Sequence, residues 1–255
     1  IEMKLNIIDK KSVVVITPTI ASPKLIDAIN SVDNQTYPDV KHLVVADGVE
    51  YWYKLANLLD QLPDSDTHVK LQTTLAPENT GGGGFYGHRI YAAYSHLVNA
   101  DYVFFLDEDN WYESNHVETL VKTIQDNKLD FAYSLRSIYD ADKNYICDDN
   151  CEALGQWPIY FTHPTQEQHF LVDTSSYAFD REFLIKAASI WHSGWGGDRR
   201  FFNSIREQTK HANSRHRTLC YRLDGNQGSV TSEFFDKGNA YYNDFYKGDF
   251  PWLKA

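Results

Sequence analysis

Cysteine, excess positive charge and long apolar runs are all scarce in this sequence, and each scarcity excludes a class of protein. The 255 residues include three cysteines, Cys147, Cys151 and Cys220, which cannot all pair, so a disulfide-stapled secreted domain is excluded and a reducing compartment is expected. No stretch approaches the ~20 consecutive apolar residues of a membrane-spanning helix. Basic residues number 24 and acidic residues 35, and the net charge of -11 repels nucleic acid. The composition therefore predicts a cytoplasmic protein that does not bind nucleic acid.

Several catalytic and metal-binding motifs are missing as well. Cys147 and Cys151 stand in a C-x3-C arrangement, but no second pair of ligands follows at the spacing of a zinc finger. The histidines show no H-E-x-x-H spacing, and no serine lies in a G-x-S-x-G elbow. The sequence gives little support to a structural zinc site, a zinc protease or a serine hydrolase.

Strand-like and helix-like segments alternate through the first half of the chain. Continuous apolar or β-branched runs predict buried strands, with a weaker one near 69–71, and apolar residues at helical spacing predict helices between them. The stronger strands are expected at 12–17, 42–48 and 102–106, and the helices at 22–35, 53–62 and 87–99. This alternation predicts a mostly parallel, right-handed α/β sheet flanked by helices. Hydrophobic residues make up 42% of the chain, which suffices for one large domain spanning residues 1–255.

Beyond Asn127 the regularity fades. The segments 131–140 and 170–179 have the composition of strands, and helices are expected after Asp180 and over 198–208. The basic stretch HANSRHR (211–217) is expected to be solvated, and the tail from residue 225 onward shows no clear period. This half predicts a smaller, mixed region.

Three successive carboxylates, Asp107, Glu108 and Asp109, end the strand expected at 102–106. Their mutual repulsion is relieved either by a cation or by solvent. Carboxylates two positions apart in an extended chain point to the same side, and such oxygen donors suit Mg or Mn, which keep open positions for phosphate oxygens. Two interpretations stay open at this point, a metal site and a solvated acidic turn.

The loop ENTGGGGFYGHR (78–89) contains a glycine pattern. Gly82, Gly84 and Gly87 fit the G-x-G-x-x-G spacing of dinucleotide-binding proteins. In those proteins the glycines come directly out of a buried strand, whereas here APENT intervenes after a weakly apolar segment. A loop that approaches a ligand closely is favoured over a dinucleotide site.

Two further carboxylates are candidates for binding or catalysis. Asp47 follows a predicted strand, where it would either accept hydrogen bonds from a base or ribose or form an ordinary Asp-Gly turn. Asp198 follows Trp195 and two glycines, and it is either a helix N-cap or a general base at the lip of a cleft, with Trp195 as a stacking platform for a sugar. Taken alone, the N-cap is the commoner role.

In order along the chain, these stretches resemble the inverting glycosyltransferases of family 2, which have the GT-A fold. The opening VVVITPTIASPKLIDAINSVDNQTYPDVKHLVVADG is similar to the start of that family, and ENTG with the later HR is similar to its Asn-x-Gly loop and following Arg. YVFFLDEDN resembles its D-x-D motif, and GGDRRFF its distal motif of an acid followed by paired aromatics. The resemblance spans about 13–202 and implies a Rossmann-like, mostly parallel sheet with a smaller mixed acceptor-side region. The nucleotide-sugar-binding half would be about 1–110, and the acceptor-binding and catalytic-base half about 111–255.

The resemblance implies a donor site at the strand ends. Asp109 would ligate a divalent Mn or Mg that bridges the diphosphate, with Asp107 and Glu108 near the ribose and the metal. Asp47 would read the base beside the turn at 17–19, and Arg89 would face the nucleotide or its phosphates. The nucleotide-binding residues so implied are Thr17, Pro18, Thr19, Asp47, Arg89, Asp107 and Glu108.

On the acceptor side, the resemblance implies that Asp198 deprotonates the acceptor hydroxyl, with Trp195, Gly196 and Gly197 beside it. The implied activity is transfer of a hexose from a UDP- or dTDP-linked sugar to a carbohydrate or glycolipid acceptor, with inversion. Polysaccharide biosynthesis and peripheral association with the inner face of the membrane would follow. Two alternatives stay open: an NAD-dependent oxidoreductase that uses the 82–87 glycines, and a non-catalytic sugar-nucleotide-binding module.

Overall fold

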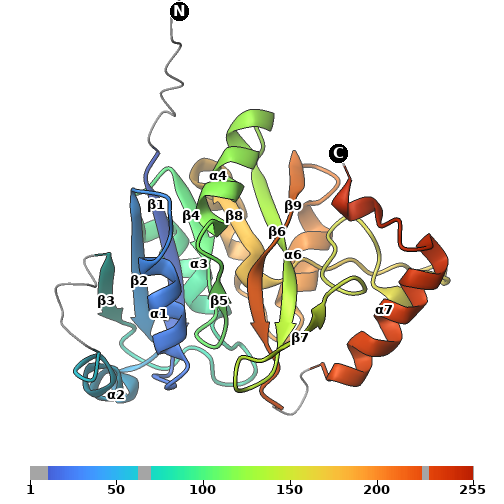
Figure 1. Cartoon of the computed structure of the whole chain (residues 1–255). Helices are drawn as coiled ribbons and strands as arrows, with labels where there is room; N and C mark the ends of the chain where they lie inside the picture. Colours follow the sequence, from blue (N-terminus) through green and yellow to red (C-terminus); the bar gives the residue numbers. More distant parts are fainter. Residues whose placement is uncertain (1–10, 63–69, 226–229, 255) are drawn as a thin grey trace, which may run out of the picture.

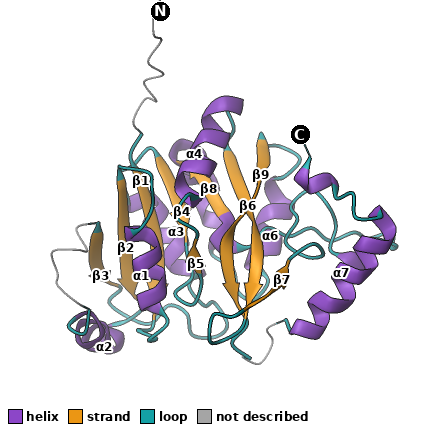
Figure 2. Cartoon of the chain, viewed as in Figure 1, coloured by secondary structure: helices purple, strands orange, loops and turns teal. Residues whose placement is uncertain are grey.

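The computed structural model describes residues 11–62, 70–225 and 230–254. Within these ranges the chain forms one nine-stranded sheet covered by helices (Figures 1 and 2). The strands are β1 Val13–Thr19, β2 Val40–Ala46, β3 Leu71–Leu75, β4 Tyr102–Phe105, β5 Trp111–Tyr112, β6 Phe131–Tyr139, β7 Tyr145–Asp148, β8 Tyr177–Asp180 and β9 His211–Arg222. The helices are α1 Leu25–Asp33, α2 Val49–Leu59, α3 His88–Leu97, α4 His116–Asn127, α5 Arg181–Ala187, α6 Gly197–Ile205 and α7 Ser232–Tyr246.

The strand order is β3-β2-β1-β4-β8-β6-β9-β5, with β7 paired to β6. Strands β3, β2, β1 and β4 are all parallel, which confirms the alternation predicted from the first half of the sequence. Strand β8 runs antiparallel to both β4 and β6, so the second half of the sheet is mixed. The carboxyl ends of β1, β2 and β4 consequently meet at one edge, where open α/β sheets bind ligands.

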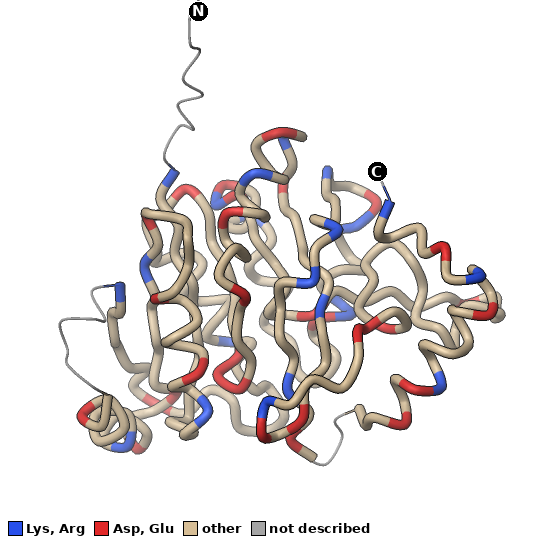
Figure 3. Tube along the Cα trace, in the orientation of Figure 1, with Lys and Arg blue, Asp and Glu red and all other residues tan. Residues whose placement is uncertain are grey.

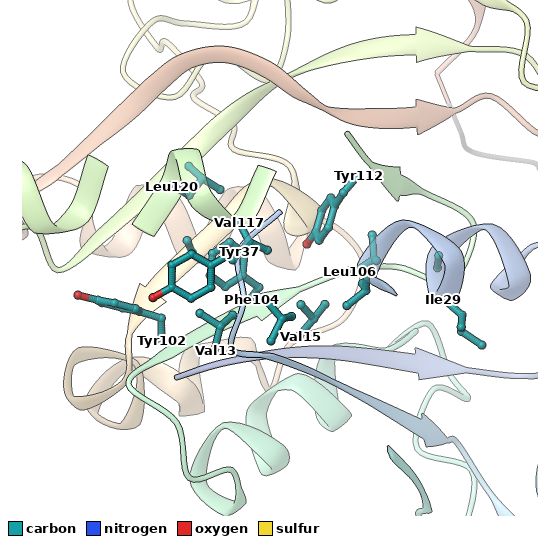
Figure 4. Packing of buried hydrophobic residues seen from close by; sticks show 14 of the residues in the cluster. Val13, Val15, Ile29, Tyr37, Tyr102, Phe104, Leu106, Tyr112, Val117 and Leu120 are labelled. Atoms are coloured by element: carbon teal, nitrogen blue, oxygen red, sulfur yellow. The ribbon is translucent and has the colours of Figure 1, made fainter. Parts of the chain in front are cut away.

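The two faces of the sheet bury separate apolar clusters. Val13 and Val15 of β1 pack with residues of α1 and α4, as Figure 4 shows. Val14 and Ile16 point the other way and pack with residues of α3 and α6. Successive side chains of a strand alternate between faces, so an uninterrupted apolar run requires cover on both.

The structure differs from the sequence predictions mainly in the second half. Residues 170–179 are not one strand, because Asp173 accepts a hydrogen bond from the Ser175 amide (2.8 Å) and starts a 3₁₀ turn before β8. The stretch 211–217 is part of the long strand β9, which pairs with β6, and Arg215 and His216 in it are exposed. The tail contains helix α7, which was missed although its buried Phe235, Gly238 and Tyr242 follow helical spacing.

Several boundaries agree or shift slightly. Asp180 caps α5 as predicted, accepting from the amides of Glu182 (3.0 Å) and Phe183 (3.3 Å). Helix α2 begins four residues earlier than the sequence indicated, and Val69 of the weak predicted strand lies outside the described residues. Among the described residues, no helix has the length and apolarity needed to cross a membrane.

Candidate active site

A cleft of about 550 Å³ opens at the carboxyl ends of the parallel strands. It is lined from both halves of the chain, and Figure 3 shows several acidic segments along the lower edge of the sheet in that view. The charged and aromatic residues that line it are Asp47, Tyr86, His88, Asp107, Glu108, Asp109, Arg136, Glu152, Asp173, Trp195, Asp198, Arg199 and Tyr221.

The acidic segment after β4 is a turn, in which the Asn110 amide donates to the Asp107 carbonyl (3.2 Å). The extended geometry expected from the sequence was therefore wrong, yet Asp107 and Asp109 both line the cleft. Asp107 accepts hydrogen bonds from the Tyr91 hydroxyl (2.8 Å) and the Ser175 hydroxyl (3.3 Å). Burial, followed by the charges of Asp109 and Asp173, raises the pKa of Asp107 to about 8.

Asp109 is the less satisfied of the two carboxylates. Burial, followed by the charges of Asp224 and Glu108, raises the pKa of Asp109 to about 6. Within the described residues no other side chain donates a hydrogen bond to it, although the Lys24 ammonium lowers its pKa from a distance. The turn is therefore crowded by like charge rather than freely solvated.

Glu108 ties two loops together. Its carboxylate accepts a hydrogen bond from the Thr19 hydroxyl and others from the amides of Ser22 (3.1 Å) and Ile20 (3.4 Å). Burial raises the pKa of Glu108 despite these donors. The contacts hold the cleft-lining Thr19 at the end of β1, and the segment that follows it, against the turn after β4.

Asp47 organises the glycine-rich loop. Its buried carboxylate accepts from the Thr80 amide (2.7 Å), the Thr80 hydroxyl (2.8 Å) and the Gly81 amide (2.9 Å). Asn79 donates to the Asp47 carbonyl (2.9 Å) and accepts from the Gly82 amide (2.8 Å). The amides of Gly81 and Gly82 are thus turned toward side chains of this chain rather than toward a ligand.

Three of the predicted site residues do not line the cleft. Thr17 is buried in β1, where its hydroxyl lies 2.8 Å from Nε2 of His42. Arg89 contacts residues of the glycine-rich loop instead. Its guanidinium donates to the Thr80 carbonyl (3.3 Å), and its Cζ lies 3.4 Å from the centre of the Phe85 ring.

The third, Gly197, is the first residue of α6, and a Cβ there would lie 2.7 Å from the His88 ring. This close packing explains the need for glycine at that position.

Asp198 lies in the first turn of α6 and lines the cleft, but the N-cap position is Gly196, so the N-cap interpretation was wrong. Burial raises the pKa of Asp198, and its carboxylate accepts from the adjacent Arg199 amide (2.7 Å).

Sequence reasoning missed a buried ion cluster on the side of the cleft that the second half of the chain forms. Arg136 of β6 donates to Asp149 (2.8 Å), Glu152 (2.5 Å) and Asp173 (2.6 Å), and Arg199 lies 3.3 Å from Glu152. The available signal was an arginine in the middle of an apolar strand, which requires buried partners. Nothing in the sequence identified which carboxylates those partners are.

The strand end fits a divalent metal. The described residues contain no group of three or more His, Cys, Asp or Glu with metal-ligand geometry. A Mg or Mn ion shared with a diphosphate needs only one or two carboxylates, since phosphate oxygens and water complete its coordination. Asp109 and Asp107 could supply such oxygens, in a site where burial, followed by the charges of neighbouring acids, raises their pKa values.

Solved structures resemble this fold at low sequence identity. S. aureus TarS 1-349 in complex with UDP-GlcNAc has a TM-score of 0.59 at 12% identity, over 94% of this chain and 68% of that one. The complex with UDP gives 0.59 at 12%, over 92% and 72%. For S. aureus TarS 1-349 the values are 0.58 and 13%, over 83% of this chain but only 60%, less than two thirds, of that one. No curated protein matches the sequence.

The architecture of these neighbours confirms the predicted α/β fold of GT-A type, with its Rossmann-like sheet and a mixed second half. The sequence model named "Glycosyl transferase family 2" matches residues 12–205, which is more than half of the chain. This chain belongs to glycosyl transferase family 2.

Proposed function

We propose that the chain transfers a hexose from a nucleoside-diphosphate sugar to a hydroxyl group of a carbohydrate or glycolipid acceptor, with inversion at the anomeric carbon. The observation that carries the proposal is that one cleft, in a chain of this family, is lined by Asp107, Asp109 and Asp198. The TarS neighbours in complex with UDP and UDP-GlcNAc support a uridine donor, and a dTDP-linked sugar is the next candidate.

The donor would bind where β1, β2 and β4 end. Pro18 and Thr19 line this wall directly, whereas Asp47 is bonded to Thr80 and Gly81. We assign to Asp47 the positioning of the 79–81 loop against the base. Thr17 and Arg89 support the same wall from behind, through His42 and Thr80.

Asp109 and Asp107 would hold a divalent Mn or Mg, which when bound offsets the charge that develops on the leaving diphosphate. Glu108 keeps Thr19 and Ser22 in place beside them. The acidic turn is therefore divided between a carboxylate that positions the loop and carboxylates available to the metal.

Asp198 would act as the general base. It takes the proton of the acceptor hydroxyl while that oxygen bonds to the anomeric carbon and the bond to the diphosphate oxygen breaks on the opposite face. Burial raises the pKa of Asp198, which strengthens it as a base. Trp195 and Gly196 line the cleft on this side, and the constraint on Gly197 fixes the start of α6 beside His88.

The proposal extends to the chain's organisation and setting. Residues up to about 110 would form the donor half of one domain and the remainder the acceptor half. A glycolipid acceptor would place the protein at the inner face of the membrane, in polysaccharide biosynthesis.

Calorimetric titration of UDP into wild type and Asp109→Asn, each with Mn²⁺ and with EDTA, tests the donor site. We expect binding only when both the metal and Asp109 are present. Asp142→Asn is a matched control, because Asp142 is an exposed acid outside the cleft.

Absence of binding of both UDP and dTDP to the wild type would contradict the proposal. Binding of NAD without metal would instead support the oxidoreductase alternative. Tight UDP-sugar binding with no transfer to any acceptor would indicate a non-catalytic module.

A further inference from the structure

The glycine-rich loop, residues 81–87, is held by defined contacts and exposes the side chain of Tyr86. The amides of Phe85 and Tyr86 both donate to the Gly81 carbonyl (3.0 Å each), which closes the loop on itself. A Cβ on Gly81 would lie 2.6 Å from the Tyr86 carbonyl, and one on Gly87 would lie 2.7 Å from Pro18. The loop is therefore packed at both ends, and its run of glycines has structural causes.

This loop is joined to the loop that precedes α6. Nδ1 of His88 lies 2.8 Å from the Ser193 carbonyl, which can only accept, so that nitrogen carries the proton. The rings of Phe85 and His192 lie 5.6 Å apart. A Cβ on Gly194 would lie 3.1 Å from the Gly84 carbonyl. Three separate contacts thus hold residues 81–88 against residues 192–194.

Each of the two joined loops places an exposed aromatic ring on the cleft. Tyr86 is 58% exposed and Trp195 is 65% exposed, and both line the same cavity. Large aromatic side chains left in water beside a polar cleft are available to stack on a ligand.

The backbone at Tyr86 supports a functional role. Its φ of 51° lies in the left-handed region, which a residue with a bulky side chain seldom adopts. Glycine occupies four of the five preceding positions, so a glycine at position 86 would fit this loop without strain. Strained conformations of this kind are retained mainly at ligand sites.

We propose that Tyr86 and Trp195 form an aromatic clamp that binds a pyranose ring of the acceptor through the C–H face of the sugar. The ring is assigned to the acceptor because Trp195 lies three residues before Asp198, the base that would receive the acceptor's proton. This inference rests on the proposed function and adds Tyr86 as a residue that determines acceptor specificity.

Methyl pyranosides of glucose, galactose, mannose and N-acetylglucosamine are the probes. Their binding is measured by saturation-transfer NMR at millimolar concentration, with UDP and Mn²⁺ present, and UDP affinity is measured separately by calorimetry. We expect at least one glycoside to bind wild type and to bind Tyr86→Ala and Trp195→Ala about fivefold or more weakly. Tyr86→Phe should bind it nearly as wild type does, because the ring face is kept.

Tyr53→Ala is the matched control, since Tyr53 is 72% exposed on α2 and does not line the cleft. Wild type that binds UDP but none of the glycosides, or alanine variants that bind them as wild type does, would overturn the clamp. A loss of UDP affinity in Tyr86→Ala would assign the ring to the nucleotide base and would likewise overturn it. Failure of the wild type to bind UDP or dTDP would contradict the proposed function instead.

Discussion

Replacing Arg136 by methionine removes the cation from a cluster of three carboxylates while keeping most of the apolar volume of the side chain. The side chain of Arg136 is 3% exposed, and its three partners, Asp149, Glu152 and Asp173, are 1%, 4% and 8% exposed. These small exposed fractions limit how well water can take the place of the guanidinium. The variant is thus left with buried negative charge.

The expected loss of unfolding free energy is about 3–5 kcal/mol at pH 7. Three charge-assisted hydrogen bonds at about 1.5–3 kcal/mol each would give a larger sum if they were additive. All three carboxylates keep other partners, which lowers the loss. Asp173 retains the Ser175 amide at 2.8 Å. Glu152 retains Arg199 at 3.3 Å, and Asp149 retains the amides of Cys151, Glu152 and Ala153, each at 2.9 Å.

Urea unfolding of wild type and Arg136→Met at pH 7 and pH 5 measures the difference. Without the guanidinium, a folded-state carboxyl pKa rises above its unfolded value, so protonation relieves the unpaired charge and the deficit should shrink at pH 5. Lys122→Met is the control, because its ion pair with Asp126 is exposed and should contribute at most about 1 kcal/mol. A loss below about 1 kcal/mol in Arg136→Met, or one that does not change with pH, would refute the reasoning.

Three further outcomes follow from the same structure. Asp198→Asn should lower kcat about 10²- to 10⁴-fold in a transfer assay and leave the UDP affinity measured by calorimetry unchanged. Weak UDP binding by this variant would instead indicate a structural role for Asp198. Burial lowers the pKa of His42 and of His116 to about 3, so the unfolded chain takes up protons below pH 6.5 that the folded chain does not. Each histidine should therefore lower the free energy of unfolding by about 2 kcal/mol between pH 7 and pH 5. In urea unfolding of His42→Asn, the fall between these two pH values should be smaller by that amount, and an unchanged fall would contradict this. Gly155→Ala should destabilise the protein by more than about 3 kcal/mol, because a Cβ there would lie 2.0 Å from the Tyr133 hydroxyl. Gly83→Ala should lose only about 1 kcal/mol, because Gly83 has a similar positive φ but no atom within 4 Å of the added Cβ. Equal melting temperatures of the two variants would contradict the comparison.

The first half of the fold was predictable because its signals are local. A strand buried on both faces, such as β1, must be a continuous apolar run whatever it pairs with, and the turn or helix that follows it is marked by polar residues. Strand β9 gave no such signal. Its residues are polar at 213–217, and it becomes a strand because β6 offers a parallel partner from the other half of the chain.

The residues of the candidate site were predictable where a short motif marks them and not where they depend on contacts between distant parts of the chain. Asp107, Asp109 and Asp198 were identified from short motifs, and the cleft brings them together. The partners of Arg136 lie 13, 16 and 37 residues away, and separations of that kind follow no period of a helix or strand. Asp47 was predicted to read a base and it lines the cleft, but the sequence did not show that its carboxylate accepts hydrogen bonds from the amides of Thr80 and Gly81.

The cleft carboxylates differ in how their charge is compensated, and this difference is the physical reason for proposing a cation at the strand end. In the second half of the chain Glu152 and Asp173 face Arg136, and Asp47 and Glu108 each accept several hydrogen bonds from neighbouring loops. Asp109 has no such donor among the described residues, and burial and neighbouring acids raise its pKa. A diphosphate that entered beside Asp109 would add further negative charge to the least compensated point of the cleft. We therefore expect donor binding at this point to require a cation held by that carboxylate, so the metal requirement and the Asp109 requirement should be lost together.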